Sequence, residues 1–131
     1  MILIFGGAYQ GKLDYALKRF DLKEKNVYHC DMESMVIDFD RKIIADLDRF
    51  VLACIKEGVD PRECLEDNIE RLKDKVIICN DNSEGVVPMD PTERAWREMC
   101  GRCMVYLGQQ AEEVWRVFCG IPTRIKPEGE K

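Results

Sequence analysis

The apolar and polar positions of the chain follow two periods, one typical of strands and one typical of helices. Ile2–Phe5 and Lys75–Cys79 are short and almost wholly apolar, which predicts central strands covered on both faces. Asn26–Cys30 and Ser34–Phe39 predict a second and a third strand of the sheet. Apolar residues recur at helical spacing in three stretches, which are residues 13–20, 43–55 and 65–72. A long helix is also expected from Asp90 to about Ala111.

Capping signals and turn residues indicate where several of these elements begin and end. Asp60-Pro61 and Asp90-Pro91 each combine an N-cap acid with a proline at the first helical position. Glu113–Cys119 alternates like a strand, and Gly120-Ile121-Pro122 turns the chain toward a hairpin partner at Thr123–Lys126. The C-terminal part is therefore predicted to be a β-hairpin.

The order of these elements predicts one three-layer α/β domain with a mainly parallel central sheet and a C-terminal β-hairpin. The domain is expected over residues 1–126, with a polar tail at 127–131. The net charge of −5 argues against a general nucleic-acid surface, which would normally be basic. No apolar run approaches the roughly 20 residues of a membrane span. Met1–Phe5 also lacks the features of a signal peptide, so a cytoplasmic protein is expected.

A glycine-rich loop separates the first predicted strand from the first predicted helix. It reads Gly6-Gly7-Ala8-Tyr9-Gln10-Gly11-Lys12-Leu13, and it contains the G-x-x-x-x-G-K spacing of a phosphate-binding loop. Glycines let backbone amides surround a polyphosphate, the helix N-terminus favours anions, and the lysine adds a mobile positive charge. All eight residues are candidates for nucleotide binding, and Lys12 is also a catalytic candidate. The alternative is an ordinary glycine-rich turn between a strand and a helix.

The metal site that usually accompanies such a loop is incomplete in this sequence. Leu13 stands where a serine or threonine normally holds Mg²⁺, and it has no oxygen to offer. P-loop proteins also keep a carboxylate that holds the metal or its waters, at the end of a buried strand. Asp38, in the third predicted strand, is the candidate for this catalytic and metal-binding role, with Asp40 in reserve. For both residues the alternative is an exposed acid in a turn.

A polar loop follows the predicted central strand Lys75–Cys79. It lies at the edge where open α/β sheets bind ligands. Asn80, Asp81 and Gly85 in this loop are therefore candidates for binding a substrate or a nucleotide.

The cysteines and the single histidine are expected to have packing roles. Seven cysteines occur without the spacing of a disulfide framework, which suits reduced thiols in a core. Cys100 and Cys103 form a lone C-x-x-C motif inside a predicted helix, and without a second pair packing is favoured over a metal or redox role. His29 lies in a predicted strand, which also favours packing.

Several motifs occur along the chain in the order of one known family. Gly6–Leu13 is similar to G-G-A-R-S-G-K-S, and Ile78–Pro88 is similar to V-[ST]-N-E-V-G-x-G-I-V-P. Arg94–Arg102 is similar to R-x-F-R-D-x-x-G-R. Ala111–Trp115 and Gly120–Lys126 resemble the closing motifs A-D-E-V-W, G-I-P and I-K. Over roughly half its length the chain thus resembles the bifunctional adenosylcobinamide kinase/adenosylcobinamide-phosphate guanylyltransferases of cobalamin synthesis.

The resemblance implies a RecA-like P-loop fold, ATP or GTP as ligand together with Mg²⁺, and a homo-oligomer. It also implies two reactions on a corrinoid substrate. The first phosphorylates the aminopropanol hydroxyl of adenosylcobinamide, and the second transfers GMP from GTP onto that phosphate through a guanylylated histidine. Arg94 and Arg97 lie in the matching R-x-F-R motif and become candidates for binding the substrate or the nucleotide. Neither a nucleic acid nor a membrane is expected as a partner.

Departures from the family pattern concern both reactions. The family's histidine lies in a basic helix between the second and third strands, where this chain has only Asp31–Ser34 between its predicted strands. Guanylyltransfer is therefore not expected. Met104-Val105 replaces the family's N-Q pair, and Leu13 replaces the hydroxyl residue of the loop. Two hypotheses stay open, which are an enzyme that retains kinase activity and a non-catalytic homologue that acts in binding or assembly.

Overall fold

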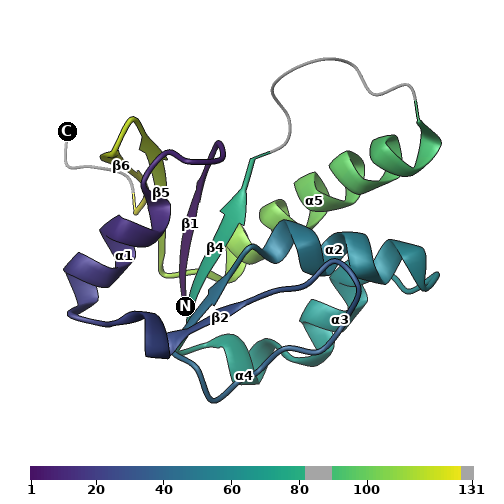
Figure 1. The fold of residues 1–131 in the computed structure, drawn as a ribbon, viewed down its shortest axis with the longest axis horizontal. Helices are drawn as coiled ribbons and strands as arrows, with labels where there is room; N and C mark the ends of the chain where they lie inside the picture. Colours follow the sequence, from purple (N-terminus) through teal and green to yellow (C-terminus); the bar gives the residue numbers. More distant parts are fainter. Residues whose placement is uncertain (82–89, 128–131) are drawn as a thin grey trace.

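A six-stranded sheet forms the centre of the structure, a computed structural model that describes residues 1–81 and 90–127 (Figure 1). The strands are β1 (Ile2–Gly6), β2 (Val27–His29), β3 (Ile43–Ala45), β4 (Val76–Asn80), β5 (Glu113–Phe118) and β6 (Ile121–Lys126). They lie in the order β2-β3-β4-β1-β5-β6. The first five in this order are parallel neighbours, and β6 pairs antiparallel with β5. The predicted fold class, a mainly parallel sheet with a C-terminal hairpin, is confirmed.

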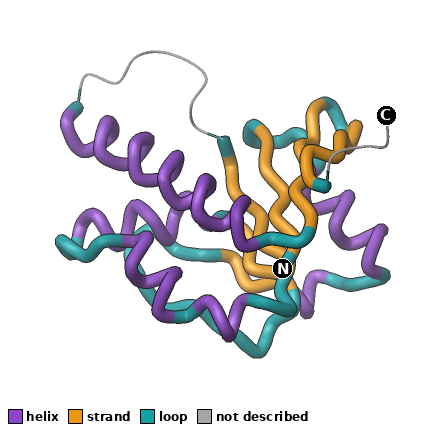
Figure 2. The backbone as a smooth tube through the Cα atoms, turned by 180° about the vertical axis from the view of Figure 1, so that it is seen from behind, coloured by secondary structure: helices purple, strands orange, loops and turns teal. Residues whose placement is uncertain are grey.

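Helices pack on both faces of this sheet, which gives the three layers. They are α1 (Lys12–Phe20), α2 (Leu47–Lys56), α3 (Pro61–Asp67), α4 (Ile69–Leu72) and α5 (Pro91–Gln110), and a short 3₁₀-helix spans Glu24–Asn26. Helix α1 packs on one face, and α2–α5 pack on the other (Figures 1 and 2).

Alternating side chains of the central strands divide the core into two clusters. Leu3 and Ile77 point into the cluster formed with α2–α5, whereas Ile4 and Ile78 point into the cluster under α1. All four side chains are buried. A strand covered on both faces needs apolar residues at every position, not at every second one. This explains why these strands are unbroken apolar runs in the sequence.

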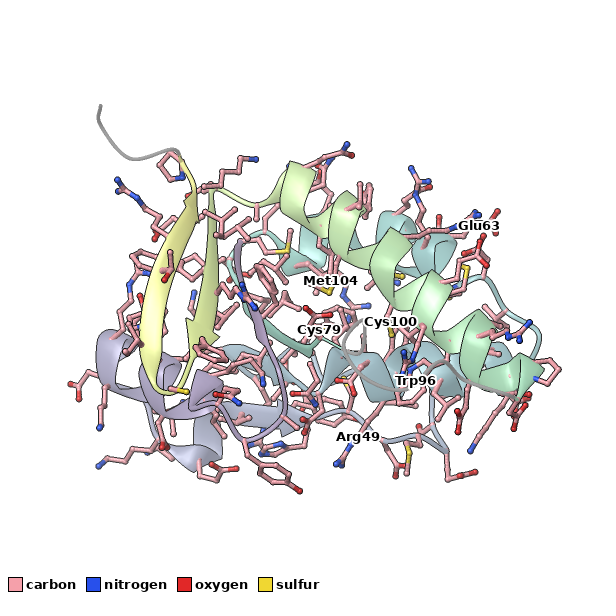
Figure 3. The ribbon with its side chains drawn as sticks, turned by 90° about the horizontal axis from the view of Figure 1, so that it is seen from above. Arg49, Glu63, Cys79, Trp96, Cys100 and Met104 are labelled. Carbon is pink, nitrogen blue, oxygen red and sulfur yellow. The ribbon has the colours of Figure 1, made fainter. Side chains whose placement is uncertain are left out.

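One face of α5 packs in the cluster formed with α2–α5. Trp96, Cys100 and Met104 follow each other at four-residue spacing, and Cys100 lies near Cys79 of β4 (Figure 3). Cys100 and Cys103 are both buried, and burial raises the pKa of the Cys103 thiol to about 12. Both residues of the C-x-x-C motif are therefore part of the core, as the sequence predicted.

Three further predictions about the sheet and the helices are confirmed by the structure. Ile2–Phe5 lies in a central strand with parallel partners on both sides, β4 and β5. β5 and β6 form the predicted hairpin, with its turn at Cys119-Gly120 and the second strand already beginning at Ile121. Helix α5 begins after Asp90, whose side chain accepts a hydrogen bond of 2.8 Å from the amide of Thr92. Aspartate and proline thus start this helix as expected.

The third predicted strand, Ser34–Phe39, is wrong. This segment has no regular secondary structure, and the third strand is instead Ile43–Ala45, which was predicted as the start of a helix. Ile37 and Phe39 are half-buried against the core cluster of α2–α5, and the Arg71 guanidinium lies 4.0 Å from the centre of the Phe39 ring. Ile37 and Phe39 therefore pack against the helical layer, and the segment does not pair in the sheet.

Some predictions concern residues that the structure does not describe. The part of the polar loop that contains Gly85 and residues 128–131 of the predicted tail lie outside the described ranges, so these predictions stay open. Within residues 1–81 and 90–127, no helix is both long enough and apolar enough to cross a membrane. One packing prediction is wrong, because Cys119 is exposed on the turn between β5 and β6.

Candidate phosphate-binding site

The carboxyl ends of four parallel strands meet at one edge of the sheet. Gly6 at the end of β1 is in register with Asn80 at the end of β4. His29 at the end of β2 is in register with Ala45 at the end of β3. Open α/β sheets bind ligands at this edge, where the loops leave the strands. The glycine-rich loop therefore begins at the position where a ligand site is expected.

Both motif glycines of the loop are required by its backbone. Gly6 has a φ angle of 155° and Gly11 a φ angle of 90°, a range that residues with side chains rarely adopt. A Cβ atom on Gly6 would lie 2.4 Å from the backbone oxygen of Val117. A Cβ atom on Gly11 would lie 3.2 Å from the Cα of Gly120. The loop thus packs backbone against backbone on the β5–β6 hairpin, with no room for a side chain at Gly6 and only a tight fit for one at Gly11.

Hydrogen bonds from two neighbouring strands hold the loop in place. The amide of Cys119 donates to Oε1 of Gln10 at 2.6 Å, and the amide of Gly120 donates to the Gln10 carbonyl at 2.9 Å. On the other side of β1, the amide of Asp81 donates to the Gly6 carbonyl at 2.7 Å. These contacts fix the loop between the end of β4 and the β5–β6 turn, so its shape exists before any ligand binds.

Lys12 is buried at the start of α1, and its ammonium group turns back into the loop. Its Nζ donates a hydrogen bond of 2.5 Å to the carbonyl oxygen of Gly7. Burial lowers the pKa of Lys12, and the nearby carboxylate of Asp48 opposes this shift. A partly desolvated ammonium group gains more from an anion than an exposed one does. The position of Lys12 therefore suits the binding of a negatively charged ligand in the loop.

The loop and the start of α1 open into a cavity of about 260 Å³. The N-cap residue of α1 is Gly11, which has no side chain to accept hydrogen bonds from the first amides of the helix. The cavity is lined by Ala8, Tyr9, Gln10, Gly11, Lys12, Leu13, Asp14, His29, Ala45, Asp46, Arg49, Ile78 and Asn80. Seven of the eight predicted nucleotide-binding residues, all except Gly6, line this cavity or the second one described below.

His29 lies at this cavity between two carboxylates. Its Nδ1 lies 2.9 Å from Oδ2 of Asp46, and its Nε2 lies 2.6 Å from Oε1 of Glu24. These hydrogen bonds, that to Glu24 first, raise the pKa of His29. The prediction that His29 packs within a strand is wrong, because His29 is the last residue of β2 and its side chain is exposed at the loop.

Asp48 lies buried behind the loop and links three elements. Its carboxylate accepts hydrogen bonds from the backbone amide of Asn80 at 3.3 Å and from the Asn80 side chain at 3.4 Å. Its carbonyl oxygen accepts one from Nε1 of Trp96 at 2.7 Å. Burial raises the pKa of Asp48, although the bonds from Asn80 oppose this. The residue therefore joins α2 to β4 and α5 beneath the site.

A second cavity, of about 480 Å³, lies against the same loop. It is lined by Gly7, Ala8, Gln10, Asp81, Glu93, Trp96 and Arg97. Of the residues predicted to bind the substrate or nucleotide, Asp81 and Arg97 line this cavity and Asn80 lines the first. Arg94 lines neither of the two, and Gly85 lies outside the described residues.

The structure does not bring Asp38 to the loop. Asp38 pairs with Arg41 at 3.3 Å, and Arg41 also contacts the carbonyl of Lys25, just before β2 begins. Lys25 lies just before the amino end of β2, and Arg41 lies just before the amino end of β3. These ends are at the opposite edge of the sheet from the glycine-rich loop. Asp38 was predicted to be catalytic or metal-binding because it would follow a buried strand. In the structure, Asp38 does not follow a strand. The reserve candidate, Asp40, lies in the same connection.

The acid that follows the third strand is Asp46, which the sequence prediction missed. It comes directly after Ile43-Ile44-Ala45 and lines the cavity with Lys12. In the sequence, Asp46 follows an apolar triplet, which is a pattern typical of a strand end. The triplet also fits the helical spacing of the residues that follow, so the strand was not recognised. Arg49, in the first turn of α2, was missed for the same reason.

The side chains at the loop do not fit the usual Mg²⁺ site of such loops. Leu13 supplies no oxygen, and of the described residues Asp46 is the one acid that lines the cavity directly after a strand. Over residues 1–81 and 90–127, no three His, Cys, Asp or Glu side chains converge to hold a metal ion. The carboxylate expected of a P-loop site is thus present, but its hydroxyl partner is missing.

The strand order, and the glycine-lysine loop at the end of central strand β1, define the P-loop class of α/β folds. A family model for cobinamide kinase / cobinamide phosphate guanyltransferase matches residues 56–125, and the chain belongs to this family. The bifunctional adenosylcobalamin biosynthesis protein CobU of Salmonella typhimurium is 37% identical to the chain over 51 residues. That alignment covers 39% of this chain and only 28% of the relative's length. The matched range begins after the glycine-rich loop, so the family match does not include the loop residues.

Proposed function

We propose that the chain binds a nucleoside triphosphate, ATP or GTP, at the loop Gly6–Leu13. The observation that carries this proposal is the position of buried Lys12, whose cavity also receives the amino end of α1. Backbone amides, a helix dipole and an ammonium group there favour the same ligand, a chain of phosphates. Because the loop is held by hydrogen bonds from both sides, little conformational entropy is lost when the phosphates bind.

In the proposed kinase reaction, the second cavity takes the acceptor. It borders the loop at Gly7 and Ala8, so an acceptor hydroxyl there would lie next to the bound phosphates. Arg97 offers a cation and Trp96 an aromatic surface. Phosphoryl transfer depends mostly on positioning and charge neutralisation, which these groups could supply together with Lys12. Membership of the family suggests a corrinoid alcohol as the acceptor.

Guanylyltransfer is not part of the proposed function. Residues 30–42, which connect β2 to β3, contain no helix that could carry a second nucleophile. The chain also has one histidine, and both ring nitrogens of His29 are bonded to carboxylates. Only the first of the family's two reactions therefore has candidate residues here.

A non-catalytic binding protein is the second candidate function. It is favoured by Leu13, because the loop has lost the oxygen that usually positions the metal at the phosphates. Such a protein would keep nucleotide binding and lose phosphoryl transfer. Incubation with γ-labelled ATP and adenosylcobinamide separates the two, since only the kinase forms a labelled corrinoid phosphate that disappears in Lys12→Ala.

Calorimetry with ATP, GTP and their diphosphates tests nucleotide binding directly. Lys12→Ala should weaken binding by roughly 1.5–3 kcal/mol, the value of a hydrogen bond to a charged group. Lys25→Ala is the matched control, because it removes one positive charge from an exposed position outside both cavities. If wild type fails to bind any of the four nucleotides at millimolar concentration, with or without Mg²⁺, the proposed function is wrong.

The homo-oligomer implied by the family resemblance stays a prediction. β6 is an edge strand whose Ile121 and Ile125 are exposed, which offers an apolar surface to a second copy. Light scattering after gel filtration tests it, and a monomer at high micromolar concentration would contradict it.

A further inference from the structure

Arg49 is a cation of the first cavity that lies outside the phosphate-loop motif. It belongs to the first turn of α2, where its side chain is exposed (Figure 3). It lines the cavity together with Lys12. Within the described part of the chain, no carboxylate lies within ion-pair distance of its guanidinium group. Arg49 therefore presents an unneutralised positive charge to the space beside the loop.

The two acids nearest to Arg49 in sequence are occupied by other partners. The Asp46 carboxylate is bonded to Nδ1 of His29. The Asp48 carboxylate is buried and accepts two hydrogen bonds from Asn80. Neither carboxylate forms an ion pair with the guanidinium group in the described residues. By contrast, the exposed arginines of α3 and α5, Arg62 and Arg102, each pair with a glutamate one helical turn away.

Arg49 adds a second positive charge to a site that lacks the residue needed to place a divalent cation. A triphosphate carries several negative charges, and a typical P-loop uses its hydroxyl residue to place a divalent cation against them. Leu13 cannot do this. An arginine supplies a permanent charge and a fork of N–H donors that can bind phosphate oxygens in pairs.

We propose that Arg49 binds the phosphate groups of the nucleotide and replaces the divalent cation there, so that the site binds nucleotide without a metal. This inference rests on the proposed nucleotide binding at Lys12. It assigns Lys12 and the loop amides to one side of the phosphates and Arg49 to the other, where α2 begins. Arg49 is a binding residue in this arrangement, since it would touch the ligand itself.

The test measures the affinity of the full chain for ATP by calorimetry, once with Mg²⁺ and once with EDTA. Three variants are compared with wild type, namely Arg49→Met, Arg49→Lys and the control Arg62→Met. Methionine keeps the length of the side chain and removes its charge, and lysine keeps the charge without the fork. Because Arg49 is exposed, the variants should unfold at the wild-type urea concentration, which is checked before binding is measured.

If Arg49 replaces the divalent cation, the affinity of wild type for ATP in EDTA should lie within about threefold of its affinity in Mg²⁺. Arg49→Met should weaken binding in EDTA roughly 10- to 100-fold, Arg49→Lys less, and Arg62→Met not at all. If wild type binds only with Mg²⁺, or if Arg49→Met binds like wild type in EDTA, the inference fails while the proposed function stands. If wild type binds in neither condition, the proposed function fails and the inference falls with it.

Discussion

Nδ1 of His29 lies 2.9 Å from Oδ2 of Asp46, and this contact joins the carboxyl ends of β2 and β3 beside the phosphate loop. Nε2 of the same ring lies 2.6 Å from Glu24, in the short helix before β2. One imidazole thus lies between two carboxylates. The hydrogen bond to Glu24, and then that to Asp46, raise the pKa of His29 above its ordinary value.

The first prediction concerns the pH dependence of stability that follows from this raised pKa. Protonated His29 stabilises the folded state, so the contribution should be complete below the unfolded pKa of about 6.5 and lost as pH rises through the folded value. Urea unfolding of wild type and His29→Gln from about pH 5.5 to about pH 9 measures it. Because His29 is 44% exposed, the difference should stay below about 1 kcal/mol.

Salt gives the control for this prediction. The groups involved are partly exposed, so high salt should reduce the stability difference between wild type and His29→Gln at the acidic end of the range. A difference that is independent of pH, or that grows as pH rises, would contradict the assignment of a raised pKa to His29.

The second prediction concerns Asp48, an acid whose pKa is raised by burial. The folded state holds the proton of such an acid more tightly than the unfolded state, so its ionisation destabilises the fold as pH rises. Asp48→Asn removes the ionisation and keeps the shape, at a cost independent of pH because one of the two donors of Asn80 loses its acceptor. Relative to wild type, the variant should gain stability as pH rises above the unfolded pKa of about 3.9, as measured by urea unfolding. Asp74→Asn, at an exposed acid, should change stability by less than about 0.5 kcal/mol throughout.

The sequence was sufficient for the central sheet and the loop, because these parts obey strong local rules. Ile2–Phe5 is apolar at every position, which a doubly covered strand requires, and it leads directly into Gly6 and Gly11. Asp90-Pro91 starts α5 with two independent signals. The loop could be recognised from the sequence because its backbone requires glycine at positions 6 and 11. This requirement is local and does not depend on the rest of the fold.

The connection between β2 and α2 could not be predicted in the same way. Met35–Phe39 and Ile43–Ala45 are both short apolar segments, and only tertiary packing decides which of them enters the sheet. No glycine or proline separates β3 from α2, where the chain instead turns at Asp46 with a φ angle of 58°. The end of β3 at Asp46 is therefore obscured by the helical spacing that continues into α2, and the sequence points to Asp38 instead.

The third prediction is that Gly6→Ala destabilises the protein. The Cβ atom would lie 2.4 Å from the backbone oxygen of Val117, at a φ angle of 155°, so either β1 or β5 must shift. Strain and overpacking together should cost at least about 2 kcal/mol in the free energy of unfolding. Thermal and urea unfolding measure this loss, and the same variant should bind nucleotide more weakly because the loop moves.

Gly101→Ala is the matched control for this substitution. Gly101 lies in the interior of α5, and among the described residues a Cβ atom added there would meet nothing within 4 Å beyond the helix's own backbone, so alanine should fit. Alanine is the better helix former, and the variant should gain up to about 1 kcal/mol. If both variants behave alike, close contact with the hairpin is not what requires glycine at position 6.

The last prediction is that the protein forms no covalent guanylyl intermediate. In that reaction a neutral imidazole nitrogen attacks the α-phosphorus of GTP, and pyrophosphate leaves. Distance does not exclude His29, because it lines the same cavity as Lys12. His29 is not expected to react because its two carboxylate partners bond both ring nitrogens and favour the protonated ring. A protonated imidazole has no free lone pair with which to attack phosphorus.

Wild type incubated with α-labelled GTP and Mg²⁺ at neutral pH should therefore carry no label on a denaturing gel. Glu24→Gln removes the negative charge held at Nε2 by a hydrogen bond of 2.6 Å, so it lowers the pKa of His29 toward its ordinary value. Label that appears only in this variant would show that the carboxylate, and not the position of the ring, prevents the reaction. Label in wild type that is lost in His29→Ala would overturn the prediction, because an imidazole held between Glu24 and Asp46 would then still act as a nucleophile.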